Sequence, residues 1–241
     1  MKYLLLHHRA AERFSASLAS ADFIPVPLFP DERLNHIVAA HADTLIFSGI
    51  GAPMVNEQYA AALPEEIVPW LTLTPDSPYG DYPTDTAFNA LVMGQRLLCR
   101  PESLAPSVMT AASDAGMTII PVRQGYAKCA VLAIPSRMAA ITADTGMADG
   151  MEACGIRVLR ITPGHIALDG CDYGFIGGAS FVHDPEICCS MMADVRPTVY
   201  FFGDISAHPD SAAIAEFLSR LGCRTVSFDG PLTDFGGAVI L

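Results

Sequence analysis

The sequence has few charged residues, and this scarcity excludes several large classes of protein. Charged residues make up 17% of the 241 residues, whereas hydrophobic residues make up 51%. This composition excludes intrinsic disorder, which requires low hydrophobicity together with high charge. The 14 basic and 26 acidic residues give a formal net charge of −12 at pH 7. Because nucleic acids and anionic membranes bind to basic surfaces, we expect no nucleic-acid partner and no membrane partner.

Long hydrophobic runs and cysteine motifs are also missing. No stretch approaches the roughly 18 apolar residues of a membrane-spanning helix, and the apolar run at 3–6 is too short for a signal peptide. The seven cysteines include no C-x-x-C pair, and the adjacent Cys188 and Cys189 suit neither zinc nor an ordinary disulfide. We therefore expect a cytoplasmic protein with mostly buried, reduced thiols. No nucleotide-binding fingerprint occurs, and we expect no cofactor.

What the sequence does contain is a repeated pair of short apolar segments. Each pair begins with a small residue and about five apolar residues, a pattern typical of a buried strand. These first segments are 42–49, 89–94, 129–134, 178–182 and 237–241. A second apolar segment begins at a glycine about 25 positions later, at 116–122, 155–161 and 222–228. The sequence therefore predicts repeating units rather than one irregular domain.

A helix is expected between the two strands of each unit. The best example is 208–222, where apolar residues fall at i, i+3, i+4 and i+7, namely Ile214, Phe217, Leu218 and Leu221. Pro209 suits the first helical position, and Gly222 suits the position after the helix. Residues 102–115 and 144–154 occupy the same place in their units. The segment 197–204 is interpreted as an extra strand inside an insertion in the last unit.

The two ends of the chain complete each other in this pattern. The segment 237–241 has no helix after it, whereas 1–30 contains a strand, a helix and a strand. Joining them predicts five units in a single α/β domain, a propeller closed by the terminal strands, which leaves no free sheet edge. The predicted units are 235–241 plus 1–30, 31–80, 84–124, 125–168 and 174–232.

A ring of five ββαβ-like units resembles the pentein fold of guanidino-group-modifying enzymes. That superfamily includes arginine deiminases, dimethylarginine hydrolases and amidinotransferases, and also a non-enzymatic ribosome anti-association factor. More specific strings are similar to a bacterial branch of the same fold. They lie at 124–134, 140–150, 164–181, 208–210 and 229–241. The resemblance covers nearly the whole chain and implies an α/β propeller around a central cavity.

The chain departs from the superfamily at the two catalytic positions that the resemblance implies. The hydrolases carry a nucleophilic cysteine on the last inner strand after a Gly-Gly pair, but Gly236–Gly237 is followed by 238–241, which contains no thiol. Their general-base histidine begins a middle inner strand in a His-x-Asp setting, but the matching segment 126–129 contains no histidine. The usual Cys–His pair is therefore missing.

Cys129 is the best remaining candidate for a nucleophile. A nearby cation lowers the pKa of a thiol, and Lys128 is adjacent in sequence, although alternation along a strand would point the two side chains apart. His165 is the candidate base if the fold brings it close. Both residues also have ordinary structural explanations, Cys129 as a small packed side chain and His165 as a hydrogen-bonded structural histidine.

A further set of residues is expected to bind a ligand in the cavity. Carboxylates recognise a planar guanidinium through paired hydrogen bonds, and glycines permit close approach of backbone to a ligand. The predicted ligand-binding residues are Asp81, Asp85, Asn89, Lys128, Gly177, Gly178 and Asp234. Turn formation and helix capping explain aspartates in such loops equally well. His183–Asp184 and His208–Asp210 lack the spacing of a known metal site, and no metal is expected.

Three functions stay open from the sequence. The first is binding of a small cationic metabolite, with a guanidino or amine group, in a central acidic pocket without catalysis. The second is a cysteine-dependent C–N hydrolase or deiminase that acts on an arginine-like substrate with a site rebuilt around Cys129. The third is a non-catalytic protein-interaction factor. The expected partner is a small molecule, and the sequence allows a homodimer.

Overall fold

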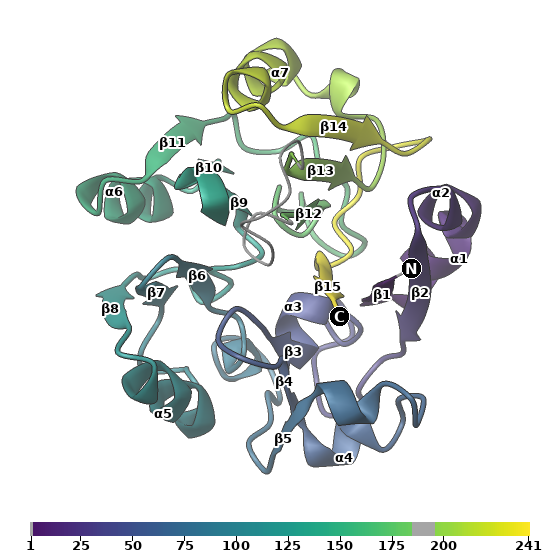
Figure 1. The fold of residues 1–241 in the computed structure, drawn as a ribbon, viewed down its shortest axis with the longest axis vertical. Coiled ribbons are helices and arrows are strands. Elements are labelled where there is room, and N and C mark those ends of the chain that lie inside the picture. Colours follow the sequence, from purple (N-terminus) through teal and green to yellow (C-terminus); the bar gives the residue numbers. More distant parts are fainter. Residues whose placement is uncertain (1, 185–195) are drawn as a thin grey trace.

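The computed structural model describes residues 2–184 and 196–241, and in these residues fifteen strands form five three-stranded sheets (Figure 1). The first sheet contains β1 (Lys2–His7), β2 (Phe23–Leu28) and β15 (Ala238–Ile240). The second contains β3 (Ile46–Phe47), β4 (Met54–Asn56) and β5 (Thr72–Thr74). The third contains β6 (Leu91–Met93), β7 (Arg96–Cys99) and β8 (Thr118–Pro121).

The remaining two sheets repeat the same arrangement. The fourth contains β9 (Val131–Ile134), β10 (Ala139–Thr142) and β11 (Arg157–Arg160), and the fifth contains β12 (Ser180–His183), β13 (Thr198–Phe201) and β14 (Arg224–Ser227). In every sheet the middle strand pairs antiparallel with one neighbour and parallel with the other. We call the antiparallel neighbours, which are β15, β3, β6, β9 and β12, the inner strands. The fold is mixed α/β with small sheets, and no described sheet closes on itself.

Helices connect the parallel strands of each sheet, because a parallel pair needs a crossover connection. They are α1 (His8–Arg13), α2 (Ser15–Ser20), α4 (Glu57–Ala60), α5 (Pro106–Asp114), α6 (Thr145–Ala153) and α7 (Ser211–Arg220). The described residues also contain four short 3-10 helices, at Val68–Trp70, Thr84–Thr86, Pro135–Arg137 and Ile205–Ala207. None of the helices in the described residues is long and apolar enough to span a membrane.

The predicted pairing of the two chain ends is confirmed. Strand β15 lies antiparallel to β1, with Leu4 opposite Ile240 and Leu6 opposite Ala238. The backbone N–H of Leu241 also donates to the carbonyl of Tyr3 at 2.9 Å. The terminal segments therefore share one sheet, as Figure 1 shows by the yellow strand beside the purple ones.

Three predicted elements differ from the structure. The apolar segment 42–49 begins with one helical turn, α3 (Ala42–Leu45), before the strand, because a short apolar run does not distinguish a buried strand from a buried turn. The segment 197–204 provides β13, the middle strand of the fifth sheet, and is not an extra strand. Helix α7 begins at Ser211, so Pro209 lies just before the helix, whereas Gly222 has the expected left-handed φ of 72° after it. Cys188 and Cys189 lie outside the described residues.

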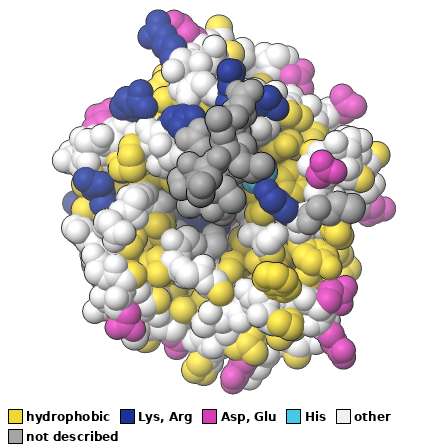
Figure 2. All heavy atoms as spheres, in the orientation of Figure 1, with side chains coloured by type: hydrophobic (Ala, Val, Ile, Leu, Met, Phe, Trp, Pro, Cys, Tyr) yellow, Lys and Arg dark blue, Asp and Glu magenta, His cyan; other side chains and the backbone are white. Residues whose placement is uncertain are grey.

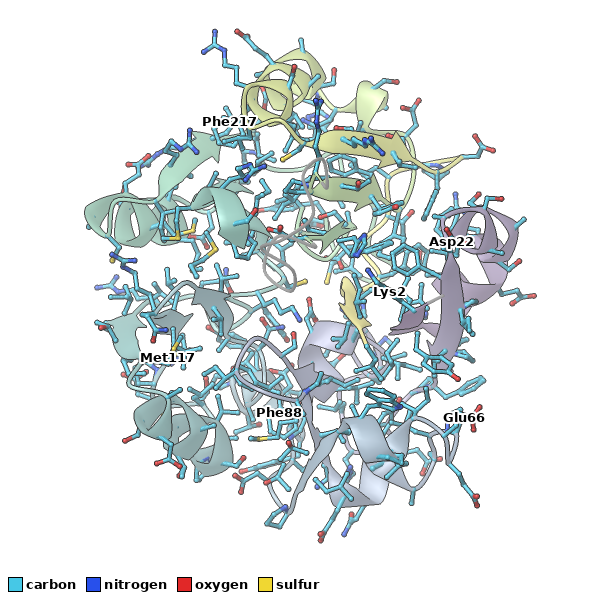
Figure 3. The ribbon with its side chains drawn as sticks, viewed as in Figure 1. Lys2, Asp22, Glu66, Phe88, Met117 and Phe217 are labelled. Atoms are coloured by element: carbon cyan, nitrogen blue, oxygen red, sulfur yellow. The ribbon has the colours of Figure 1, made fainter. Side chains whose placement is uncertain are left out.

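Five hydrophobic clusters each join two neighbouring sheets. They join the first sheet to the second, the second to the third, the third to the fourth, the fourth to the fifth, and the fifth to the first. Strand alternation explains how β1 contributes to two clusters, because Leu5 packs toward the second sheet whereas Leu4 and Leu6 pack toward the fifth. Figure 3 shows Phe88, fully buried in the cluster between the second and third sheets, and Glu66 at the periphery. The inner strands are thereby held around a common centre.

Candidate functional site

The segments that precede the five inner strands meet at the centre of the molecule. Asn89 Oδ1 accepts hydrogen bonds from the backbone N–H of Lys128 at 2.8 Å and of Cys129 at 3.3 Å. The N–H of Gly178 donates to the carbonyl of Cys129 at 3.0 Å. These bonds connect the third sheet to the fourth and the fourth to the fifth.

Further backbone bonds connect the remaining two sheets to this centre. The N–H of Gly237 donates to the carbonyl of Gly178 at 2.8 Å, and the N–H of Asp43 donates to the carbonyl of Gly236 at 3.0 Å. The fifth, first and second sheets are joined in this way. Residues that are far apart in sequence are therefore fixed beside one another by hydrogen bonds that involve mainly the backbone.

Gly177 and Gly178, both predicted to bind a ligand, allow the segments at the centre to pack this closely. A Cβ atom on Gly178 would lie 1.9 Å from Asp234 Oδ1, and one on Gly177 would lie 2.4 Å from the carbonyl oxygen of Val131. Real Cβ atoms do not approach other atoms so closely, so both positions require glycine. Close contact with other protein atoms therefore accounts for glycine at both positions, without any ligand.

Asp234 is held at the centre by backbone donors. Its Oδ2 accepts from the N–H of Phe175 at 2.8 Å, and its Oδ1 accepts from the N–H of Gly236 at 2.9 Å. The Sγ of Cys129 lies 3.6 Å from Oδ2 and 3.8 Å from Oδ1. Burial raises the pKa of Asp234 to about 6, although its hydrogen bonds favour the ionised form.

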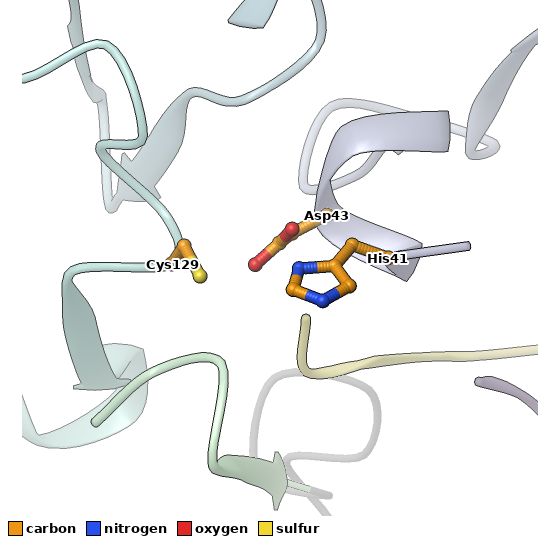
Figure 4. A group of neighbouring side chains, drawn as sticks. All are labelled: His41, Asp43 and Cys129. Carbon is orange, nitrogen blue, oxygen red and sulfur yellow. The ribbon is translucent and has the colours of Figure 1, made fainter. Parts of the chain in front are cut away.

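Beside this pair lie a histidine and a second aspartate (Figure 4). The ligand atoms of His41, Asp43 and Cys129 all lie within 4.8 Å of one another, and the three residues are 2%, 1% and 4% exposed. His41 precedes α3 and Asp43 lies within it, whereas Cys129 precedes β9. The structure thus brings together a thiol, an imidazole and a carboxylate from two different sheets.

The surroundings of His41, Asp43 and Cys129 favour the uncharged thiol and the uncharged imidazole near pH 7. Burial, followed by the charges of Asp234 and Asp43, raises the pKa of Cys129 well above its usual value. Burial lowers the pKa of His41 to about 4. Burial and Asp234 raise the pKa of Asp43 to about 7, against an opposing effect of Lys128. Two buried carboxyl groups therefore lie near enough to interact, and Lys128 only partly offsets the effect of burial and of Asp234 on Asp43.

A cavity of about 620 Å³ adjoins this group and is lined by residues of four inner strands, β6, β9, β12 and β15, and by residues on either side of β3, namely Asp43, Ser48 and Gly49. Asp43, Lys128, Gly177 and Gly237 precede their inner strands and line the end of the cavity at the centre, which we call the floor. Ser136 and Asp184 follow their inner strands and line the opposite end, which we call the mouth. The volume lies within the range of small-molecule sites.

The cavity holds one cationic side chain and two carboxylates in the described residues. Lys128 Nζ donates to Ser48 Oγ at 2.8 Å, and burial lowers the pKa of this lysine against the opposing charges of Asp43 and Cys129. Asp184 Oδ2 accepts from the N–H of Ser136 at 3.0 Å. The second oxygen of each carboxylate, Asp184 Oδ1 and Asp43 Oδ2, is buried without a hydrogen-bond partner among residues 2–184 and 196–241.

A family model matches residues 5–239, almost the whole chain. The chain belongs to DUF6873, a family of unknown function. No curated protein matches this DUF6873 sequence. Among solved structures it is similar to a dimethylarginine dimethylaminohydrolase variant, determined as an adduct with S-methyl-L-thiocitrulline. The likeness covers 100% of this chain and 99% of that one, with a TM-score of 0.52 and 11% identity, and it supports a pentein-like fold.

Three other sequence-predicted residues of this DUF6873 chain lie away from the cavity. Asp81 is exposed, and its Oδ1 accepts from Asn35 Nδ2 at 2.8 Å. Asp85 is buried, and its Oδ2 accepts from the hydroxyl of Tyr126 at 2.5 Å. Asn89 is also buried, and its side chain binds the backbone rather than facing the cavity. Of the predicted ligand-binding residues, Lys128 and Gly177 line the cavity, and Asp234 lies behind it.

The structure does not place His165 beside Cys129. His165 is exposed in the loop after β11, the outer strand of its sheet, and its ring centroid lies 5.8 Å from that of His208. The histidine beside the thiol is His41, which sequence reasoning missed. One signal for it was present, because His41-Ala-Asp43 is a His-x-Asp pattern directly before an inner strand, although in a different unit from the one expected.

Proposed function

We propose that the five sheets are the units of a closed, five-unit propeller of the pentein type. The repeated strand order supports this proposal, as does the series of hydrophobic clusters that links each sheet to the next and the fifth to the first. The pairing of β15 with β1 supports a unit that contains both chain ends. In this arrangement the cavity lies on the axis of the propeller.

We propose that the cavity binds a small molecule that carries an amine or guanidinium group. The observation that carries this proposal is that each cavity carboxylate, Asp43 at the floor and Asp184 at the mouth, has one buried oxygen that no described residue pairs with. An unpaired buried carboxylate oxygen is costly, and a charged N–H donor satisfies it with a strong hydrogen bond. Lys128 and Ser48 in the cavity wall offer donors for an oxygen of the same ligand.

A ligand screen on metal-free protein tests this function. Agmatine, arginine, citrulline and methylated arginines are added one at a time, and the thermal unfolding midpoint is measured, because a ligand that binds only the folded state raises it. We expect at least one cationic compound to raise the midpoint and the neutral citrulline to raise it less. If no cationic compound shifts the midpoint, the proposed ligand class is wrong.

The same screen on two variants locates the contact. Asp184→Asn keeps the size of the side chain and removes its charge, and we expect at least about tenfold weaker binding, because a hydrogen bond to a charged group contributes about 1.5–3 kcal/mol. Asp81→Asn is the matched control, since Asp81 is exposed and does not line the cavity. Equal binding to both variants would argue against contact at Asp184.

Thiol-dependent C–N hydrolysis is the second candidate, and the proximity of His41 to Cys129 favours it. In such a reaction the thiol sulfur attacks the amidinium carbon, His41 accepts the thiol proton, the amine leaves with a proton, and water then hydrolyses the thiouronium. The raised pKa of Cys129 argues against a ready nucleophile. We therefore expect iodoacetamide to label exposed Cys171 faster than Cys129, and the reverse order would favour hydrolysis.

A further inference from the structure

The cluster of His41, Asp43 and Cys129 has the composition of a metal site. Its three possible ligand atoms, an imidazole nitrogen, a carboxylate oxygen and a sulfur, all lie within 4.8 Å of one another. Figure 4 shows one ring nitrogen of His41 turned toward Asp43 and Cys129, with the sulfur on the other side of the carboxylate. One ion could therefore contact all three side chains after small movements.

Two of these side chains have a buried polar atom to which no described residue forms a hydrogen bond. His41 Nδ1 and Asp43 Oδ2 are buried atoms that have no hydrogen-bond partner in the described part of the chain. Most buried polar side-chain atoms in proteins have a partner, and an unsatisfied one costs about 1–3 kcal/mol. Both unpaired atoms belong to the same cluster, so a single bound ion would satisfy both.

The charges around the cluster also favour a dication. Asp43 and Asp234 are buried close enough for the charge of one to raise the pKa of the other, and the cation that acts on Asp43 is Lys128. With a thiolate at Cys129, the charges of a divalent ion and of Lys128 would balance the thiolate and the two carboxylates. Asp234 already accepts two backbone N–H bonds, so it lies beside the thiol as a supporting group.

We propose that His41, Asp43 and Cys129 bind a divalent transition-metal ion of the zinc type at the floor of the cavity. Mixed nitrogen, sulfur and carboxylate ligands are typical of zinc, whereas magnesium and calcium prefer oxygen ligands alone. Three protein ligands leave a fourth position open, and Asp43 lines the cavity. Binding forms a metal–sulfur bond and releases the thiol proton to solvent, with no change of oxidation state.

This inference goes beyond the proposed function and does not depend on it. The two proposals share Asp43, whose unpaired oxygen is open to an amine only in the metal-free protein, whereas Asp184 at the mouth belongs to the organic ligand alone. The ligand screen uses metal-free protein, and the metal titration contains no organic ligand. Either proposal can therefore fail while the other stands.

The test is a titration of the full chain, freed of metal by a chelator, with Zn²⁺ and with Co²⁺. We expect one equivalent of either ion to bind and to raise the thermal unfolding midpoint. Bound Co²⁺ should show sulfur-to-cobalt charge-transfer absorption, which reports a thiolate ligand directly and needs no variant. Binding without that absorption, or no binding of one equivalent, would overturn the proposal.

Paired variants identify the ligands. Cys129→Ser and His41→Gln should each weaken Zn²⁺ binding by at least about 100-fold, because loss of even an outer partner costs about 10–100-fold. Cys129→Ser should also abolish the charge-transfer band. Cys154→Ser and exposed His36→Gln are the matched controls and should bind as the unaltered protein does. A charge-transfer band that persists in Cys129→Ser would assign the metal to another thiol and reject this site.

Discussion

At the scale of single residues, buried carboxyl groups with raised pKa values characterise the centre of this protein. Asp85 is one example outside the cavity, with Oδ2 bonded to the Tyr126 hydroxyl and Oδ1 buried with no hydrogen-bond partner in the part of the chain that the structure describes. Burial raises the pKa of Asp85 above 3.8. Between pH 3.8 and the higher folded pKa, the carboxyl group of Asp85 is therefore mostly protonated in the folded state and mostly ionised in the unfolded state.

The first prediction concerns the pH dependence of Asp85→Asn. Because the folded pKa is raised, the contribution of Asp85 to the free energy of unfolding is greatest below pH 3.8 and decreases as the pH rises through the folded pKa. The asparagine side chain of the variant has no carboxyl proton to lose. We therefore expect the variant to gain stability relative to the unaltered protein as the pH rises from about 4 to 7, measured by urea unfolding.

Exposed Asp172 provides the control for this experiment. Its charge is not among the causes that raise the pKa of Asp85, whereas the charge of Asp81 is one of them. Over the same pH range, the stability difference for Asp172→Asn should change less than that for Asp85→Asn. A difference for Asp85→Asn that is flat, or that falls with pH, would contradict the raised pKa as the cause.

At the scale of elements, one aspartate connects a helix to the neighbouring sheet. Asp144 caps α6, since its Oδ1 accepts from the N–H of Met147 at 2.9 Å, and its Oδ2 accepts from Gln124 Nε2 at 2.9 Å. Sequence reasoning placed Asp144 at the start of a helix, where a carboxylate also interacts favourably with the helix dipole. The structure adds the second bond, to the segment that follows β8.

The second prediction is therefore that Asp144→Ala lowers the free energy of unfolding by about 0.5–2 kcal/mol, the range for loss of an N-cap. Asp144→Asn retains an acceptor for Met147 and should lose much less. Chemical denaturation of both variants measures the difference. Equal stability of the alanine and asparagine variants would show that the cap contributes nothing.

At the scale of the whole molecule, the chain ends lie in one sheet and the polar side chains are unevenly spread. On the face in Figure 2, acidic side chains lie mostly toward the rim, in keeping with the net charge of −12. Strands β15 and β1 are hydrogen-bonded neighbours, so residue 241 ends close to the start of the chain. The homodimer that the sequence allows stays a prediction.

The third prediction uses this proximity. A circular permutant that joins residue 241 to residue 1 through a short Gly-Ser linker, with new ends between exposed Asp172 and Tyr173, should fold and unfold in one cooperative transition. Circular dichroism during urea unfolding measures this. Deletion of 238–241 is the contrasting variant, and it should lose the cooperative transition because it leaves the edge of β1 unpaired. A permutant that fails to fold would contradict the close arrangement of the ends.

Much of the fold could be predicted from the sequence. Buried strands with a fixed spacing showed five inner strands, and the missing helix after 237–241 indicated that the two ends pair. Local patterns were less reliable where burial was complete, as at Ala42–Leu45, because a helical turn and a strand bury the same apolar residues there. The role of β13 as a middle strand was also missed, because only pairing partners distinguish it from an extra strand.

The sequence by itself determined the residue types at the centre, including Cys129, Lys128 and Asp234 and the His-x-Asp pattern of His41 and Asp43. Only the tertiary structure decided which of them meet. His41 and Cys129 lie 88 positions apart, and a series of backbone bonds through other segments holds them near each other, so no local spacing encodes their distance. Local periodicity fixes the strands, but contacts between the starts of separate inner strands depend on how whole sheets pack, and that packing positions the site.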